Sequence, residues 1–371
     1  MKKGKRTSPE FRTDKMEKVR NAVNVCTMCG FCKSVCPSFK ASGWDSSVAR
    51  GRVILSYGLL IGDIPADDSV VENIYTCTTC MDCVRRCPSN VNIVEIVEMC
   101  RADLVENGHI LPKHKAVADS VLKYGNPYGE KERAVNRLGK EPKKAKVGYF
   151  AGCTATFRTE KTSKAALSIF SKLKIDYTTV DEICCGSVLQ RIGWNNDDVV
   201  KMMEKNVNAV KAQGVETLVL SCAGCYRMFK EEFPKYVDVP FRVLHMSEFL
   251  AEQDLKLRPL KAKATYHDPC HLGRHAKVYD APRAVIKKIP ELEYKEMEFS
   301  KSTSRCCGGG GGVRSAFPEE SRKIAESRVA EAAFADMIIT TCPFCVGNLT
   351  MGAEGKNIRV VDLTELVDEL L

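Results

Sequence analysis

The spacing of apolar positions divides the chain near residue 134. Before that point, apolar residues recur at helical spacing in capped or helix-like segments, such as 47–60 and 89–107, which predicts a mostly helical region. After it, short β-rich runs alternate with helical patterns, which is typical of parallel βαβ sheets. The predicted strands are 146–150, 217–220, 264–267 and 337–341. The predicted helices of this part are 163–173, 226–232, 318–334 and 363–371.

The 19 cysteines repeat at fixed spacings. Two groups read C-x2-C-x2-C-x3-C-P and are offset by 51 residues: Cys26, Cys29, Cys32, Cys36 and Cys77, Cys80, Cys83, Cys87. Two further groups are offset by 117 to 122 residues: Cys153, Cys184, Cys185, Cys222, Cys225 and Cys270, Cys306, Cys307, Cys342, Cys345. The C-terminal part is therefore two copies of one unit. Only Cys100 falls outside this scheme, and its apolar neighbours predict a small buried side chain.

The chemistry of thiolates explains the first two groups. A C-x2-C-x2-C loop can place three sulfurs on one face of a cubane [4Fe-4S] cluster, and the fourth ligand usually comes from the other motif. We therefore assign one cubane to Cys26, Cys29, Cys32 and Cys87, and the other to Cys77, Cys80, Cys83 and Cys36. Zinc sites normally lack the middle repeat, and a chain of 371 residues does not need disulfides as staples.

The last two groups are more crowded than a common metal site. Each copy presents five cysteines, one more than a cubane or a zinc site requires. Adjacent cysteines can reach one cluster only from a sharp turn, and Gly186 and Gly308 follow them directly. Cys153, Cys222, Cys270 and Cys342 each follow a predicted strand, where open α/β sheets place their ligands.

Charge and hydropathy exclude several classes of protein. No run approaches 18 uncharged apolar residues, so no transmembrane segment is expected, and the N-terminus does not read as a signal peptide. A reducing cytoplasm is therefore the expected location. The net charge is +9, and ten lysines and arginines lie in the first forty residues, which suits either a solvated arm or an acidic partner. No nucleic-acid partner is expected, because aromatic interleaving and known motifs are absent.

The residues around the later cysteines resemble the paired cysteine-rich CCG domains of heterodisulfide reductase. The matching stretches are YFAGC (149–153), CCGSVLQR (184–191), SCAGCYRMF (221–229), HDPCHLGRH (267–275), CCGGGGGVR (306–314) and CPFC (342–345). With the ferredoxin part in front, the order is similar to the D subunit of that enzyme, in which its C and B subunits are joined. The insertion between the first motifs resembles the helical ferredoxin domain of succinate dehydrogenase iron–sulfur subunits.

This resemblance implies an α+β multidomain protein. Its expected segments are a basic arm (1–25), a helical ferredoxin-like domain with two cubanes (26–133), a linker (134–145) and two duplicated α/β CCG domains with small parallel sheets (146–258 and 259–371). The resemblance implies two noncubane [4Fe-4S] clusters besides the two cubanes, and no flavin in this chain. One noncubane cluster would be held by Cys153, Cys184, Cys185, Cys222 and Cys225, and the other by Cys270, Cys306, Cys307, Cys342 and Cys345.

The implied activity is reduction of the coenzyme M–coenzyme B heterodisulfide to two thiols, in the anaerobic electron transport of methanogenesis. In that family the small-molecule disulfide lies between the two noncubane clusters. The electron donor would be a partner protein, either a membrane cytochrome b, which would hold the chain at the cytoplasmic membrane, or a soluble flavoprotein. The alternatives are the iron–sulfur subunit of a flavin-dependent glycolate, lactate or glycerol-3-phosphate dehydrogenase, and a pure electron-transfer module. Complete Cys222 and Cys225 favour the reductase, because the glycolate oxidase relatives tend to lose that pair.

Three groups of other residues stand close to the cluster motifs. His267, His271 and His275 are expected to be structural, with His271 as the candidate proton donor to a leaving thiolate. The candidates for pairing with sulfonate, phosphate or carboxylate, if they are not simply solvated, are Arg191, Arg274 and Arg314. The glycine run 308–312 follows a cysteine pair rather than a strand, so it predicts close approach of backbone to a cluster or substrate rather than nucleotide binding.

Overall fold

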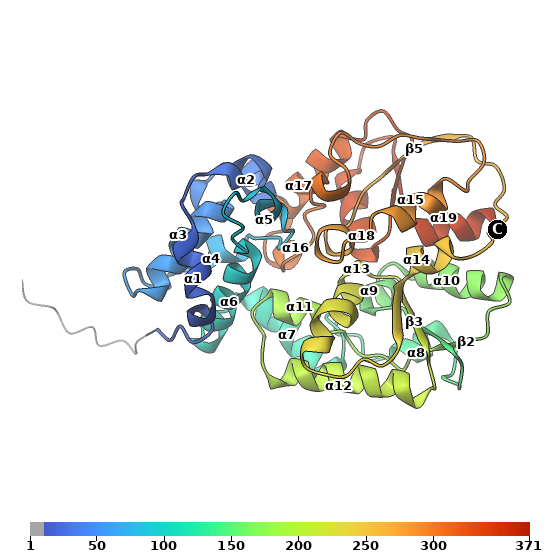
Figure 1. Ribbon diagram of the computed structural model, residues 1–371, viewed down its shortest axis with the longest axis horizontal. Helices are drawn as coiled ribbons and strands as arrows, with labels where there is room; N and C mark the ends of the chain where they lie inside the picture. The colour runs from blue at the N-terminus through green and yellow to red at the C-terminus, as the bar shows by residue number, and fades with distance from the viewer. Residues whose placement is uncertain (1–10) are drawn as a thin grey trace, which may run out of the picture.

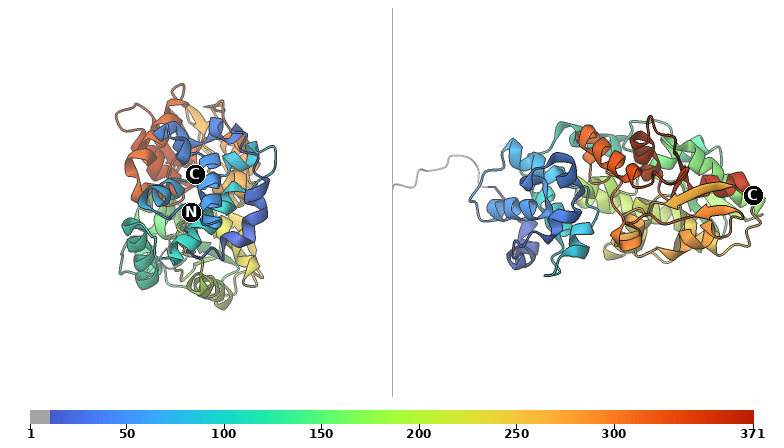
Figure 2. Two further views of the ribbon diagram at one scale, coloured as in Figure 1. Left: turned by 90° about the vertical axis from the view of Figure 1, so that its left-hand side faces the viewer. Right: turned by 90° about the horizontal axis from the view of Figure 1, so that it is seen from above.

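The computed structural model describes residues 11–371 and divides them into three packed units. A helical unit lies at one end, and two α/β units lie side by side against it (Figure 1). In Figure 2 the helical unit faces the viewer on the left, and on the right it lies at one end of an elongated molecule. Within the described residues, no helix is long and apolar enough to cross a membrane. Residues 1–10 of the predicted basic arm lie outside the described residues.

The helical unit contains the first two cysteine groups. Its helices are η1 Met16–Val19, α1 Arg20–Val25, η2 Phe31–Val35, α2 Pro37–Ser42, η3 Asp45–Ser47, α3 Ala49–Leu60, α4 Asp68–Tyr75, α5 Asp82–Arg86, α6 Ile93–Glu106, α7 Pro112–Tyr124 and α8 Ala134–Leu138. Side-chain caps start two of the longer ones: Asp67 accepts from the backbone N of Val70 at α4, and Asn92 accepts from the backbone N of Glu95 at α6. These caps fix where each of the two helices begins relative to its cysteine loop.

Two predicted connecting segments are partly structured. The second half of the predicted arm is tied to α6, because the Asp103 carboxylate accepts from the backbone N of Lys15 and Met16. The predicted linker begins with α8, in which Ala134 and Val135 are buried. Apolar side chains at these positions pack instead of extending into solvent, so neither segment is entirely a free connection.

The two α/β units repeat one topology. The first contains β1 Val147–Phe150, α9 Cys153–Phe157, α10 Glu160–Lys172, β2 Tyr177–Thr179, α11 Ser187–Arg191, α12 Asp197–Ala212, β3 Thr217–Leu220, α13 Ala223–Arg227, η4 Met228–Glu232, η5 Phe233–Lys235, β4 Arg242–His245 and α14 Met246–Ala251. The second contains β5 Ala262–Tyr266, η6 His271–His275, α15 Asp280–Ile286, β6 Leu292–Tyr294, η7 Lys301–Thr303, α16 Val313–Ala316, α17 Pro318–Ala330, β7 Met337–Thr340, α18 Pro343–Gly352, β8 Arg359–Asp362 and α19 Leu363–Leu370. Both sheets are parallel, with the orders β2-β1-β3-β4 and β6-β5-β7-β8. The predicted fold class is thus confirmed.

Matching side chains hold the ends of the inner strands in both copies. The Tyr149 hydroxyl lies 2.9 Å from the Ser221 hydroxyl, and the Tyr266 hydroxyl lies 2.6 Å from that of Thr341. In each pair, the residue with the smaller side chain directly precedes a cysteine. The duplication therefore keeps the same support beneath both predicted cysteine sites.

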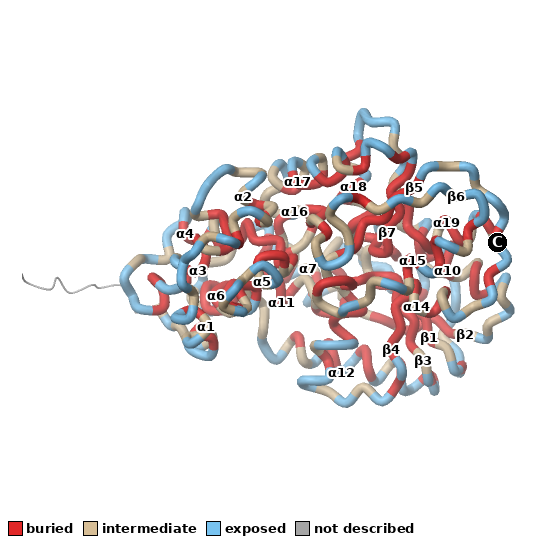
Figure 3. The backbone as a smooth tube through the Cα atoms, turned by 45° about the horizontal axis from the view of Figure 1, so that its top comes forward, coloured by how far each residue is buried: buried red, intermediate tan, exposed pale blue. Residues whose placement is uncertain are grey.

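The two α/β units bury a common core. Helix α10 of the first unit packs on α19 of the second, and α14 packs on α15, so the last helix of each unit covers the other unit. Aromatic and aliphatic side chains from both units form one buried cluster that includes Phe170, Phe249 and Leu366. Figure 3 shows the buried strands at the centre of this pair. Burial of this apolar surface fixes how the two cysteine sites face each other.

Arg101 joins all three units. It is fully buried on α6 and donates to the carbonyl oxygens of Cys77 at 2.8 Å, Arg191 at 2.6 Å and Gly311 at 2.9 Å. A Cβ atom on Gly311 would lie 2.2 Å from the carbonyl oxygen of Cys77. The glycine run therefore brings its backbone against the loop that carries the second cysteine group, whereas its close approach to a cluster or substrate stays a prediction.

Candidate functional site

The first four candidate ligands surround one hollow of the helical unit. Cys26, Cys29, Cys32 and Cys87 all line it, together with Arg50. The loop turns at Met28 and Gly30, whose φ angles of 55° and 83° lie in the left-handed region. Cys29 is exposed, whereas Cys32 is buried. The structure thus brings Cys87 from the second motif to three cysteines of the first.

The second four candidate ligands are buried between the helical unit and the second α/β unit. Burial is the main cause that raises the pKa of Cys83 well above its ordinary value. The charges of Cys80, Cys77 and Cys36 raise it further. The backbone N of Thr79 donates to Cys77 Sγ at 3.4 Å. Thiolate is the form that binds iron, and a bound metal would supply the positive charge that such closely packed, buried sulfurs need.

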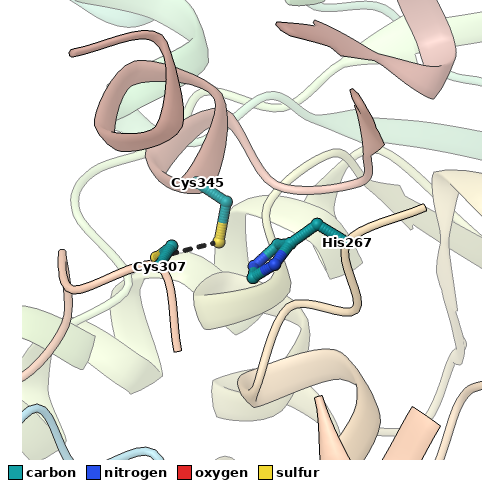
Figure 4. Close-up of side chains that lie close together, drawn as sticks. All are labelled: His267, Cys307 and Cys345. Atoms are coloured by element: carbon teal, nitrogen blue, oxygen red, sulfur yellow. Dashed lines mark hydrogen bonds between the residues drawn. The ribbon is translucent and has the colours of Figure 1, made fainter. Parts of the chain in front are cut away.

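Each α/β unit brings its own cysteines together beyond the strand ends. In the first unit, the side chains of Cys153 and Cys184, Cys185 and Cys225, and Cys222 and Cys225 interact directly. In the second unit, the equivalent contacts are Cys270 with Cys306, Cys307 with Cys345, and Cys342 with Cys345. The sulfurs of Cys307 and Cys345 are 3.4 Å apart (Figure 4). Gly186 and Gly308 have φ angles of 81° and 87°, so both cysteine pairs do precede a left-handed turn.

Two contacts connect these groups to one another. Cys222 of the first unit interacts with Cys342 of the second. Cys80 of the helical unit interacts with Cys306 of the second unit, and this contact is the main cause that raises the pKa of Cys80. The cysteines of the second cubane motif therefore meet those of the second α/β unit directly, and the cysteines of the first α/β unit meet those of the second through Cys222 and Cys342. Neither contact follows from the sequence pattern.

The donor set fits iron–sulfur clusters. The 18 cysteines of the four groups are gathered into sets of four, four, five and five, and most of them are buried. A second hollow, lined by Pro37, Arg305, Cys306 and Arg328, lies beside the packed helices α2 and α17, near the second cubane motif. The cations around it suit negatively charged clusters, because a buried charge needs compensation.

His267 belongs to the second site, although sequence reasoning favours a merely structural role for it. One ring nitrogen of His267 and the sulfurs of Cys307 and Cys345 all lie within 4.8 Å of one another. Figure 4 shows these three side chains side by side. Arg328 Nε donates to His267 Nδ1 at 3.2 Å, and His267 Nε2 has no hydrogen-bond partner. The available signal is its position, since His267 ends the predicted strand three residues before Cys270.

The other two histidines lie elsewhere. His275 Nε2 lies 2.9 Å from the carbonyl oxygen of Thr79, so it donates to the cubane loop of the helical unit. The ring of His271 is 4.7 Å from that of His275 and faces Gly224 of the first unit. Burial, followed by the charge of Arg227, lowers the pKa of His271 well below its ordinary value. Its role as a proton donor stays a prediction.

The first site has a different neighbour, Glu182, which sequence reasoning does not single out. Its carboxylate accepts from the backbone N of Gly152 at 2.7 Å, and its second oxygen has no partner. Burial raises the pKa of Glu182 well above the ordinary value, and the charge of Cys185 acts in the same direction. The equivalent position of the second unit is Ser304. The two sites therefore share their sulfurs but differ in the polar groups that surround them.

The three candidate arginines have different surroundings. Arg191 is buried and forms an ion pair with Glu98 of α6. Arg274 is buried and donates to the carbonyl oxygens of Cys80, at 2.6 Å, and Ser304. Arg314 is partly exposed, and no ion pair of Arg314 occurs among residues 11–371. The first two therefore hold the units together rather than meeting solvent.

Comparisons with known proteins agree with this organisation. A family model for a cysteine-rich domain matches residues 147–230 and 264–350, and one for a 4Fe-4S dicluster domain matches residues 22–91. The chain is 37% identical, over 94% of both chains, to the D subunit of dihydromethanophenazine:CoB–CoM heterodisulfide reductase from Methanosarcina barkeri. It is 38% identical, over 93% of both chains, to the protein of that name from Methanosarcina acetivorans. It is 31% identical to the B subunit of fumarate reductase (CoM/CoB) from Methanothermobacter marburgensis, over 92% of this chain and 71% of the relative.

Proposed function

We propose that this chain, which belongs to the family of the heterodisulfide reductase D subunit, reduces a disulfide to two thiols. Membership of this family makes it an iron–sulfur oxidoreductase subunit that works with partner subunits. The proposed substrate is the coenzyme M–coenzyme B heterodisulfide that is named for these relatives. In the reaction, the S–S bond breaks, two electrons enter, and each sulfur takes up one proton to leave as a thiol.

The contact between Cys222 and Cys342 carries this proposal. A relay needs one conducting centre at each step, whereas cleavage of a disulfide creates two sulfur products at the same moment. Two five-cysteine sites that meet at one point can hold both products. This supports a reductase over a simple electron-transfer module.

The cysteines present supply the ligands for the proposed cofactors. Two cubanes would be held within 26–133, and noncubane clusters would be held by the five cysteines of 146–258 and the five of 259–371. When bound, these clusters supply electrons, and their iron acts as a Lewis acid toward a departing sulfur. The chain itself positions the sites: the strand ends fix Cys222 and Cys342, and the CCG turns fix Cys185 and Cys307.

The proposed electron path starts at the first cubane site, where Cys29 is exposed. Three large apolar side chains near it are also exposed: Val25 at 52%, Met28 at 45% and Phe31 at 56%. An apolar patch beside a redox site suits the docking of an electron-donating partner. From there the path runs to the second cubane site and through the Cys80–Cys306 contact into the second α/β unit.

The experiment is a disulfide reductase assay with reduced viologen on anaerobic, fully metallated protein. We expect turnover of the coenzyme heterodisulfide, and its loss in Cys185→Ser and in Cys307→Ser while the cubanes remain reducible. Cys100→Ser is the matched control, because Cys100 is buried but belongs to none of the four groups. The opposite result is a wild type that reduces no disulfide but transfers electrons when a hydroxyacid dehydrogenase is added. It would support the iron–sulfur subunit of a flavin-dependent dehydrogenase instead.

A further inference from the structure

The duplication places one arginine after each CCG turn, and the two arginines have opposite surroundings. Arg191 follows the first turn and Arg314 follows the second. Arg191 is 3% exposed, pairs with Glu98 and lies 3.6 Å from a carboxylate oxygen of Glu232. Its charge is therefore neutralised inside the protein, and no ligand is needed to explain it.

Arg314 has a different environment. Its guanidinium carbon lies 5.7 Å from the centre of the Phe344 ring, on the helix that carries Cys345. Its Nη1 lies 3.0 Å from the point where a Cβ atom on Gly347 would be. Along the described chain, residues 11–371, Arg314 forms no ion pair. A half-buried guanidinium that stacks on an aromatic ring without a carboxylate retains its donors for an oxyanion.

The first unit shows why Gly347 matters. Gly347 stands two residues after the last cysteine of its C-x2-C pair, and the equivalent residue of the first unit is Arg227. Arg227 is buried and shares Glu232 with Arg191. In the second unit, the glycine leaves this place to the Arg314 side chain, and no carboxylate of the described residues 11–371 pairs with it. The two halves therefore differ in one respect, since the second presents an unneutralised arginine beside its C-x2-C helix.

Arg314 lies where the two α/β units meet, beside other partly exposed residues. Helix α18 packs on α9, which begins at Cys153. Cys153, Phe344 and Arg314 are all partly exposed. The helical unit packs on both sides of the pair, through α8 on α9 and α7 on α16, and through the Glu98–Arg191 ion pair. Arg314 therefore keeps exposed surface beside α18, the helix that carries Cys345 and packs on the element that begins at Cys153.

We propose that Arg314 binds an anionic group of the disulfide substrate, a sulfonate, phosphate or carboxylate, at the α9–α18 side of the paired cysteine sites. This inference rests on the proposed function and adds the chemical class of the substrate to it. The planar fork of Arg314 matches such groups with two parallel hydrogen bonds. The guanidinium orients the substrate and takes no part in electron transfer.

The test compares two disulfides on the full, metallated chain with reduced viologen as donor. One probe carries two sulfonates, bis(2-sulfoethyl) disulfide, and the other is the neutral 2-hydroxyethyl disulfide. We expect Arg314→Gln to raise KM for the sulfonate disulfide about tenfold with little change in kcat, because one charge-assisted contact is lost. We expect KM for the neutral disulfide to stay the same. Arg314→Lys should restore part of the loss, because it keeps the charge but not the fork.

Arg322→Gln is the matched control. Arg322 is also partly exposed and lies on the next helix, α17, but it pairs with Glu354 at 2.7 Å. Its substitution should change neither KM. If Arg314→Gln impairs both disulfides equally and lowers the melting temperature, Arg314 only supports α18 and the subsite is refuted. If the wild type reduces neither probe nor the coenzyme heterodisulfide, the proposed function fails, and this inference fails with it.

Discussion

The thiols of Cys222 and Cys342 interact directly, although the two residues belong to different copies of the duplicated unit and lie 120 residues apart in the chain. Each is the first cysteine of its C-x2-C pair and follows an inner strand of its sheet. The common core of the two units produces this contact, because it holds the carboxyl ends of both sheets together. The two five-cysteine sites of the α/β units therefore adjoin each other at Cys222 and Cys342.

Iron content tests whether these sites are filled with clusters. Four sites of four irons predict about sixteen irons per chain in anaerobically purified protein. Cys342→Ser should lower that number by about four, because it removes one ligand of one cluster, whereas Cys100→Ser should leave it unchanged. Iron and acid-labile sulfide are measured together. Stoichiometric zinc with only about eight irons would contradict cluster binding in the α/β units.

Cys80 tests the connection between the helical unit and the second α/β unit. Cys80→Ser should damage the second cubane and slow electron delivery, because Cys80 is both a proposed ligand and the residue in contact with Cys306. The substrate-dependent EPR signal of the α/β units should persist in chemically oxidised or reduced protein. Cys29→Ser is the matched comparison, since Cys29 lies in the other cubane motif and is exposed. Suppose that Cys80→Ser protein retains its α/β clusters but loses the substrate-dependent signal. This result would show that the electron path through the cubanes and the active site are not separate.

Local pattern was enough to predict the elements that carry the cysteines. The predicted strand 217–220 is β3, and the predicted strand 146–150 is β1 with one residue more. Repeated cysteine spacing likewise pointed to Cys87 as the partner of the first motif, and the structure places it at that hollow.

Contacts that depend on how the units pack could not be predicted from the sequence. The Cys80–Cys306 contact, the approach of His267 to Cys307 and the ion pair of Arg191 each join elements from different parts of the chain. No local propensity or spacing encodes such distances. Similar positions in the two copies do not guarantee similar surroundings. Arg191 is buried in an ion pair, whereas Arg314 is partly exposed and stacks on Phe344.

The glycine run provides a test of docking between the units. Gly311 has a φ of 64°, and a Cβ atom there would lie 2.2 Å from the carbonyl oxygen of Cys77. Gly311→Ala should therefore lower the free energy of unfolding by about 2–4 kcal/mol, through backbone strain and a clash at the cubane loop. Gly355→Ala is the control, because Gly355 has a φ of 76° but no atom within 4 Å of its Cβ position. It should cost about 1 kcal/mol. Equal losses in denaturant titrations would show that the Cys77 loop yields to the extra atom.

His114 makes the stability of the same junction depend on pH. It is fully buried on α7, and its Nε2 lies 2.9 Å from the carbonyl oxygen of Gly312, to which it donates. Burial lowers its pKa from 6.5 to about 4, and the charge of Arg101 acts in the same direction, while the bond to Gly312 opposes the shift. Below pH 6.5 the unfolded chain therefore binds a proton at this residue that the folded chain does not bind.

This difference predicts that folded stability falls as the pH drops from about 6.5 toward 4. Each pH unit in that window should cost about 1 kcal/mol from His114 alone, because the folded imidazole stays neutral until its own pKa is approached. His114→Gln keeps a donor for the Gly312 carbonyl but cannot titrate, so its unfolding free energy should depend less steeply on pH than that of the wild type. Anaerobic denaturant titrations between about pH 5.5 and 7.5 measure both slopes. Parallel slopes for the two proteins would mean that His114 is protonated as readily in the folded chain as in the unfolded one.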